Sequence, residues 1–289
     1  MMAAALTTTA LVAAAPANAK TPKHYHVFPM TSFNSTFVQP PASDMNYYGG
    51  SVFSKANIVS VMWNKDVLAN TQTQVPLLSA ALVNSTYIDQ AAEYSTKGVV
   101  AINGHKSTNQ DIHRGTYFGQ VVLKPHNKGT QLTDANVQQE IRLQIKLGHL
   151  PARTKNTVYM IYFPSNITIN LDGSLSCQAF GAYHFATDDA HVSKNRNIFY
   201  SVEPECNSGF SFLTFAASHE FMEATTDNVP TPGSNPDYPQ AWNDAAGFEV
   251  GDKCSGSATL KTSSDSWTVT QYYLNSLHGC STKATYTSP

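Results

Sequence analysis

One apolar stretch organises the chain, and its centre, residues 218–224, reads Ser-His-Glu-Phe-Met-Glu-Ala. Residues 210–226 are rich in Phe, Leu, Ala and Met and contain neither Pro nor Gly, so they predict a helix. Residues four positions apart share one face of a helix, so His219 and Glu223 point the same way with Glu220 beside them. Because apolar residues surround these three, we expect a buried helix whose polar side chains need partners or a cation.

This spacing is typical of metal-binding helices of the His-Glu-x-x-His type, in which two side chains one turn apart hold zinc and the Glu is the general base. In this chain the second His is replaced by Glu223. Carboxylate oxygen is also a good zinc ligand, so the replacement changes the ligand set without excluding a metal. The pattern is also consistent with a solvated face, or with core residues that satisfy one another.

A catalytic metal site needs a third protein ligand. Residues 248–252 read Phe-Glu-Val-Gly-Asp and supply two further carboxylates. We expect Glu249 to be the third ligand and Asp252 to orient the ring of His219 by a hydrogen bond. The reverse assignment stays open, and Asp244 is a more distant alternative.

The composition restricts the class of protein. The chain has 289 residues, of which 42% are hydrophobic and 13% charged, so it can bury a large core. Its net charge of −2 gives no indication of a nucleic acid or an anionic membrane as partner. Low charge together with many Thr, Ser, Asn and Tyr residues is typical of secreted proteins.

The first residues predict export. Residues 3–15 are small and apolar, and Ala-Asn-Ala at 17–19 fits the small-x-small cleavage rule, so we expect a signal peptide over residues 1–19. Residues 20–45 have no clear period and predict an extended leader, with His24 and His26 at the surface. No stretch reaches the roughly 18 apolar residues that a membrane span needs. We therefore expect a secreted, extracellular or periplasmic protein.

The four cysteines fit an oxidising compartment. Four cysteines allow three connectivities. We expect the pairs Cys177–Cys206 and Cys254–Cys280, because each would brace the chain on one side of the predicted metal helix.

The rest of the chain predicts a mixture of strands and helices. Tyr183 and His184 precede the metal helix, and we expect one of them to stabilise an oxyanion or to bind the metal, unless both are core residues. The expected helices are residues 75–94, with Pro76 near the start, and 133–147. The expected strands are residues 57–63, 99–102, 117–123, 156–163 and 197–202, and one within 266–280.

Several segments of the chain, taken together, resemble a known protein family. They are Tyr48-Gly49-Gly50 with residues 57–63, the Tyr183-His184 pair after Cys177, the His-Glu helix, Ala241-Trp242 with Asp244, residues 249–254 (Glu-Val-Gly-Asp-Lys-Cys), and Gln271 and Asn275 before Cys280. Together they resemble the exordium-like, or phosphate-induced, protein family, and most of all its secreted bacterial members. The resemblance covers most of the chain after about residue 45. It implies secretion and disulfides and supports the His-Glu cluster as a unit, but it implies no reaction.

A second resemblance is to gluzincin metallopeptidases, which have a His-Glu-x-x-His helix and a downstream Glu with a nearby Asp. The chain matches at His219, Glu220, Glu249 and Asp252. It departs at Glu223 and in the spacing from Glu249 to Asp252, which is three residues rather than four. The resemblance implies a peptidase, and both departures count against it.

The sequence thus predicts an α+β protein with a signal peptide, a leader and one domain over residues 46–289 that has a mixed sheet, a zincin-like helix and two disulfides. The leading hypothesis is a monomeric, secreted zinc-dependent hydrolase that acts on peptides or proteins. His219, Glu223 and Glu249 would hold zinc, and Glu220 would take a proton from the attacking water.

The alternative is a non-enzymatic extracellular or wall-associated protein. In it the same cluster would hold a structural calcium or zinc ion, because an acidic ligand set also tolerates calcium or manganese. A carbohydrate-active enzyme that uses two of these carboxylates is a third possibility.

Overall fold

The computed structural model describes residues 25–30, 43–187 and 197–289. The predicted signal peptide, residues 1–19, lies outside the described residues, as do His24 and most of the predicted leader.

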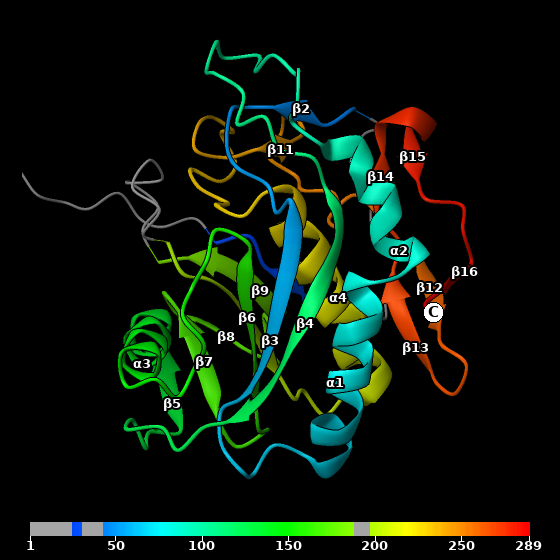
Figure 1. Cartoon of the computed structure of the whole chain (residues 1–289). Coiled ribbons are helices and arrows are strands. Elements are labelled where there is room, and N and C mark those ends of the chain that lie inside the picture. The colour runs from blue at the N-terminus through cyan, green and yellow to red at the C-terminus, as the bar shows by residue number, and fades with distance from the viewer. Residues whose placement is uncertain (1–24, 31–42, 188–196) are drawn as a thin grey trace, which may run out of the picture.

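A six-stranded mixed sheet forms the centre of the molecule, in the order β1-β9-β10-β6-β3-β4 (Figure 1). Four neighbouring strands run parallel, while β9 is antiparallel to both of its neighbours. The strands are β1 (Phe28–Pro29), β3 (Lys55–Met62), β4 (His113–Val122), β6 (Thr157–Phe163), β9 (Phe180–Ala186) and β10 (Phe199–Pro204).

The middle strand β6 shows why the sheet lies inside the protein. It reads Thr-Val-Tyr-Met-Ile-Tyr-Phe and is buried at every position, as expected for a strand covered on both faces. Successive side chains point to opposite faces, so Met160 and Tyr162 join one apolar core while Tyr159 and Ile161 join a second one. The sheet therefore separates two cores.

Helices cover both faces of this sheet (Figure 1). Helices α1 (Ala69–Val83) and α4 (Phe210–Thr226) pack on the first core, α1 against β3 and β4 and α4 against β9 and β10. Helix α3 (Asp134–Lys146) packs on the second core. Thr133 caps α3 by accepting a hydrogen bond from the backbone N–H of Asn136, and the Asn136 side chain accepts one from the Thr133 N–H.

Helix α4 is enclosed from two sides. Besides the central sheet it packs against β13, part of a small sheet in the order β13-β12-β16. Its members are β12 (Ser257–Lys261), β13 (Ser266–Thr270) and β16 (Thr285–Thr287). A helix between two sheets has no solvated face, which explains why α4 is apolar nearly all round.

Short elements complete the fold. They are β2 (Asn46–Tyr47), β5 (Gln131–Thr133), β7 (Thr168–Leu171), β8 (Ser174–Leu175), β11 (Trp242–Asn243), β14 (Tyr273–Leu274), β15 (Gly279–Cys280), α2 (Thr86–Asp89) and the 3-10 turns Gln90–Tyr94 and Asn275–Leu277.

The predicted α+β class with a mixed sheet is confirmed, and so is the helix over residues 210–226. Two element predictions are wrong. The helix expected over 75–94 begins at Ala69, continues through Pro76 and ends at Val83, and separate short turns follow it. The strand expected over 99–102 is a loop in which Val100 is 82% exposed, so its apolar residues do not mark a buried strand.

Both predicted disulfides are confirmed. Cys177–Cys206 joins the segment before β9 to the segment between β10 and α4. Cys254–Cys280 joins the chain just after residues 249–252 to β15. Within the described ranges, no helix has the length and hydropathy needed to cross a membrane.

Candidate metal centre

Helix α4 supplies the first three side chains of the site. His219, Glu220 and Glu223 lie in its enclosed middle, and each is at most 2% exposed. The packing of α4 between two sheets fixes the helix, so the i, i+4 geometry of His219 and Glu223 is realised: His219 Nε2 and Glu223 Oε1 are 2.9 Å apart. The sequence prediction that these two side chains face the same point is therefore correct.

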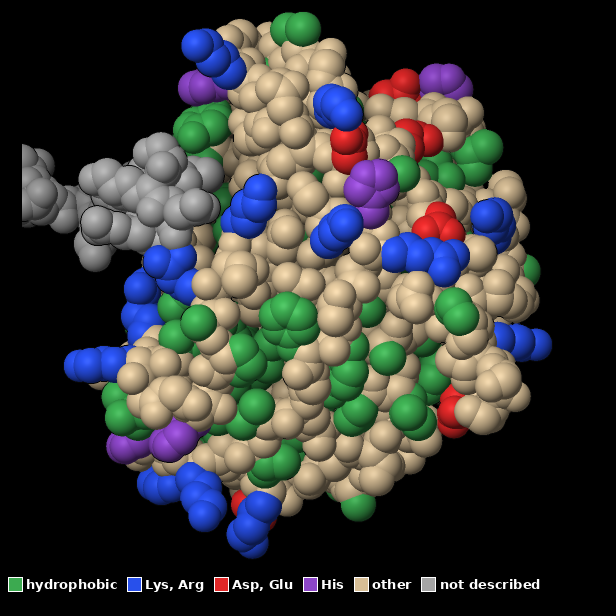
Figure 2. Space-filling model, viewed as in Figure 1, with side chains coloured by type: hydrophobic (Ala, Val, Ile, Leu, Met, Phe, Trp, Pro, Cys, Tyr) green, Lys and Arg blue, Asp and Glu red, His purple; other side chains and the backbone are tan. Residues whose placement is uncertain are grey.

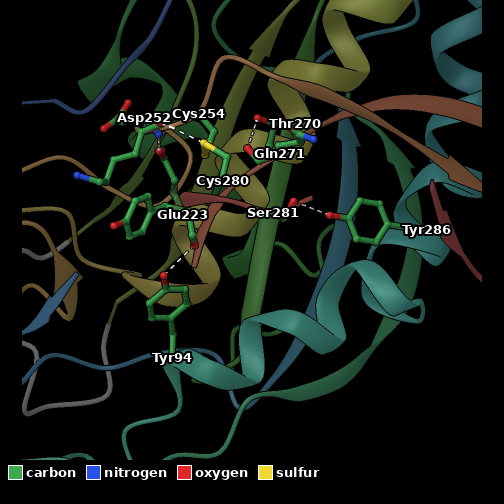
Figure 3. The surroundings of a disulfide bond; sticks show 11 residues. Tyr94, Glu223, Asp252, Cys254, Thr270, Gln271, Cys280, Ser281 and Tyr286 are labelled. Atoms are coloured by element: carbon green, nitrogen blue, oxygen red, sulfur yellow. Dashed lines mark hydrogen bonds between the residues drawn. A yellow bond between two sulfur atoms is a disulfide. The ribbon is translucent and has the colours of Figure 1, made fainter. Parts of the chain in front are cut away.

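The loop carrying Glu249 and Asp252 lies directly over this part of α4. The Asp252 N–H donates to Glu223 Oε1 at 3.0 Å, and the Glu249 N–H donates to Asp252 Oδ2 at 3.1 Å. A Cβ on Gly251 would lie 2.7 Å from the His219 ring and 2.8 Å from Glu223 Oε1, so only glycine allows this approach. Figure 3 shows Glu223 and Asp252 beside the disulfide of the same loop.

His219, Glu223 and Asp252 form a group suited to a cation. Asp252 Oδ1 lies 3.8 Å from His219 Nε2, and the ligand atoms of the three residues all lie within 4.8 Å of one another. Although His219 Nε2 lies 2.9 Å from Glu223 Oε1, neither ring nitrogen of His219 makes a hydrogen bond of suitable geometry in the part of the chain that the structure describes. A buried imidazole normally has a partner on at least one nitrogen, so an ion between these residues would complete the site.

His184 adds a second group with Glu220 and Glu223. Its Nε2 donates to the carbonyl of Asp227 at 3.1 Å, and its Nδ1 lies 3.0 Å from Glu220 Oε2. Burial, followed by the charge of His26, lowers the pKa of His184 to about 3, so the ring is neutral. A neutral ring whose Nε2 carries the hydrogen accepts at Nδ1, so the carboxyl of Glu220 is the donor.

His26 adds a third group with Glu249 and Asp252. Its Nδ1 lies 3.5 Å from Glu249 Oε2 and 3.7 Å from Asp252 Oδ2. It precedes β1, which pairs with the outer edge of β9 and brings the N-terminal segment over the cluster. Phe28 of β1 packs against the ring of His219, with the ring centres 4.9 Å apart.

Burial and mutual repulsion oppose ionisation of the carboxylates in the cluster. Burial raises the pKa of Glu220, Glu223 and Glu249 well above the usual range, and neighbouring carboxylates raise it further. Burial also raises the pKa of Glu203, on the adjacent strand β10, to about 8. Burial opposes ionisation of Asp252 too, but the nearby rings of His26 and His219 bring its pKa below the usual value.

Several oxygens of these carboxylates lack partners. Glu220 Oε1 and both oxygens of Glu249 and of Glu203 are buried and make no hydrogen bond with the described residues. Leaving buried acceptors unpaired is costly. A divalent cation would relieve both the missing contacts and the repulsion, so the donor set of imidazole nitrogen and carboxylate oxygen fits zinc or a harder ion such as manganese or calcium.

Two sequence-based assignments need correction. Tyr183 cannot reach the cluster, because adjacent residues of a strand point to opposite faces: His184 faces α4, while Tyr183 joins the second core and donates to Asp134 Oδ1 at 2.9 Å. Asp244 is bound elsewhere, since it accepts from Lys253 Nζ at 2.6 Å. Both residues leave the list of candidate site residues.

Sequence analysis missed His26, which belongs to the cluster, and Glu203, which lies on the adjacent strand β10. His26 was expected at the surface, but its side chain is only 11% exposed and faces Glu249 and Asp252. No sequence motif marks Glu203. Its neighbour Val202 points into the second core, so Glu203 points to the opposite face of the sheet, toward α4. For both residues the position depends on how strands pair, which spacing along the chain does not reveal.

The cluster lies below the surface. Its most exposed carboxylate, Asp252, has a side-chain exposure of 14%, and the N-terminal segment covers it. On the face seen in Figure 2, Asp and Glu side chains are visible only as scattered spots, as expected if the main acidic group of the protein is internal.

Comparison with known proteins gives no assignment. No family model, no curated protein and no solved structure matches the chain. The resemblance to the exordium-like family therefore stays a prediction, and the geometry of the cluster is the basis for a function.

Proposed function

We propose that the protein is a secreted, metal-dependent hydrolase whose cation is held by His219, Glu223 and Asp252. The observation that carries the proposal is the buried His219 ring, whose nitrogens make no hydrogen bond of suitable geometry with the described residues and which faces two carboxylates, Glu223 at 2.9 Å among them, with all ligand atoms within 4.8 Å. Asp252 takes the place first predicted for Glu249, because its Oδ1 lies 3.8 Å from His219 Nε2. We name zinc as the cation, since catalytic zinc sites combine histidine nitrogen with carboxylate oxygen.

Glu220 is the proposed general base. Bound zinc would polarise a substrate carbonyl and make water a better nucleophile. Glu220 neighbours His219 on α4, and its Oε1 has no partner in the described chain, so it can accept the proton of the attacking water. A nearby cation also favours the ionised form of Glu220 that this role requires. The other oxygen of Glu220 lies 3.0 Å from His184 Nδ1, so the proton that Glu220 loses on ionisation would pass to this nitrogen, and the ring would then donate to the carboxylate.

An extended peptide is the proposed substrate class. The N-terminal segment already lies beside the cluster in an extended form, with β1 paired to the edge of β9 and Phe28 packed against His219. An edge strand offers unpaired backbone groups to any chain that replaces this segment. The predicted signal peptide and the two disulfides support export.

Glu220→Gln tests the role of the base. The substitution keeps size and shape, so we expect the purified variant to retain its zinc while hydrolysis of a peptide library falls by a factor of about 10² to 10⁴. Glu93→Gln, which alters a carboxylate that bonds Ser276 outside the cluster, is the matched control and should keep full activity. Full activity in Glu220→Gln with zinc retained would remove this residue from the mechanism.

A structural ion is the second candidate. The observation in its favour is the burial of the cluster beneath the N-terminal segment. A purely structural ion predicts that removal of metal lowers the melting temperature while no peptide is cleaved under any condition. Peptide cleavage that is lost with Glu220→Gln would exclude it.

A further inference from the structure

Three histidines and three carboxylates of the cluster alternate around a closed ring. Each carboxylate directs one oxygen at each of two histidines. Asp252 lies 3.8 Å from His219 and 3.7 Å from His26. Glu223 lies 2.9 Å from His219 and 3.8 Å from His184, and Glu249 lies 3.6 Å from His184 and 3.5 Å from His26.

One histidine of this ring, His184, already has hydrogen-bond partners within the protein. Both nitrogens of His184 have partners within the protein, Glu220 and the carbonyl of Asp227. His219 and His26 are different: His219 makes no hydrogen bond of suitable geometry in the described chain, and His26 faces its two carboxylates at distances too long for strong hydrogen bonds. Ligands about 2.1 Å from a tetrahedral ion lie about 3.4 Å from one another, close to the separations around His26.

Charge balance also favours more than one ion. Glu220, Glu223, Glu249 and Asp252 carry four negative charges when ionised, and one divalent cation would leave two of them uncompensated in a buried site. The nearest lysine in sequence, Lys253, is committed to Asp244 at 2.6 Å. No Lys or Arg forms an ion pair with the four carboxylates across the described ranges. Two divalent cations would balance the charges of these four carboxylates.

We propose that the centre takes two divalent cations, the second held by His26, Glu249 and Asp252. Asp252 bridges the two ions, with Oδ1 toward the first site and Oδ2 toward the second. The fully buried Glu249, whose oxygens both lack hydrogen bonds within the described residues, is the main ligand of the second site. The inference rests on the proposed function for the first site and extends it.

The second cation would have a mechanical consequence. His26 belongs to the segment that ends in β1, while Glu249 and Asp252 belong to the loop braced by Cys254–Cys280. The ion would therefore tie the N-terminal segment to the body of the protein. Loss of this ion alone would release the N-terminal segment that covers the first site. His219, Glu223 and Asp252 would keep their positions.

Metal content measured on the purified, dialysed full chain tests the inference. After loading with excess zinc and removal of free metal, we expect two zinc ions per chain in the unchanged protein and one in His26→Ala and in Glu249→Gln. His278→Ala removes an exposed histidine that contacts Asp44 outside the cluster, and it should retain two. Loading with manganese gives a second readout, since two bridged Mn²⁺ ions show a spin-coupled electron paramagnetic resonance spectrum.

The outcomes separate the two proposals. One zinc per chain in the unchanged protein, with the same value in His26→Ala and Glu249→Gln, overturns the second site and leaves the hydrolase proposal intact. No zinc in any sample overturns both. Two zinc ions that both persist in His26→Ala and Glu249→Gln would place the second ion elsewhere and also overturn the inference. Circular dichroism shows whether each variant is folded.

Discussion

Gly251→Ala adds a single carbon atom to the cluster, at the point where the loop of residues 249–252 packs against His219 and Glu223. The new Cβ would lie 2.7 Å from the Nδ1 and Cε1 of His219 and 2.8 Å from Glu223 Oε1. Carbon atoms in proteins almost never approach so closely, so the loop or the ring must move. The ring cannot move freely, because Phe28 packs against it at 4.9 Å between ring centres.

The expected losses of folding stability and of metal affinity follow from this geometry. Overpacking a well-packed core costs about 1–3 kcal/mol. The backbone of Gly251 has no positive φ, so the cost is steric contact alone. If the loop moves away, Asp252 moves with it, and a loss of about 1.4–2.8 kcal/mol in metal binding means about ten- to a hundredfold weaker affinity.

Two assays measure the effect. Urea denaturation of the metal-depleted protein gives the steric cost, and competition with a zinc chelator gives the change in affinity. Gly279→Ala is the matched control, because its Cβ would meet only one atom, 3.7 Å away, near the same disulfide. Unchanged stability together with unchanged zinc affinity in Gly251→Ala would refute the close packing of this loop on His219.

Two other perturbations have defined outcomes. Replacing Cys254 and Cys280 together by Ser opens a loop with a sequence separation of 26 residues and should lower the free energy of unfolding by about 3–4 kcal/mol in urea denaturation, whereas a loss under 1 kcal/mol would contradict this. Glu140 accepts hydrogen bonds from the Gln144 side chain and the His126 backbone, and despite burial these lower its pKa. Its contribution is thus complete above the pKa of the unfolded chain and disappears as the pH falls through the lower folded value. Glu140→Gln should lose about 1–2 kcal/mol at pH 7, and the difference from the unchanged protein should shrink toward pH 3; a difference that grows toward pH 3 would reverse the assigned sign.

The sequence predicts α4 well because local information suffices there. An uninterrupted apolar run without Pro or Gly defines its length, and helical spacing alone places His219, Glu220 and Glu223 together. The loop with Glu249 and Asp252 also arrives where it was expected, since its backbone bonds to Glu223 through Asp252.

The remaining parts of the cluster depend on pairing between distant segments. His26 reaches Glu249 only because β1 adds to the edge of β9, a contact between residues far apart in the chain. Choosing between Tyr183 and His184 required knowing which face of β9 meets α4. The alternation of strand side chains shows that only one of the two can reach the site, but not which one.

Anomalous X-ray diffraction at the zinc absorption edge, on crystals grown from zinc-loaded protein, would locate the proposed cation itself. We expect a strong peak between His219, Glu223 and Asp252, about 2.0–2.3 Å from each ligand atom. Well-ordered side chains with no peak between them, and with hydrogen bonds from His219 to the neighbouring carboxylates, would contradict it.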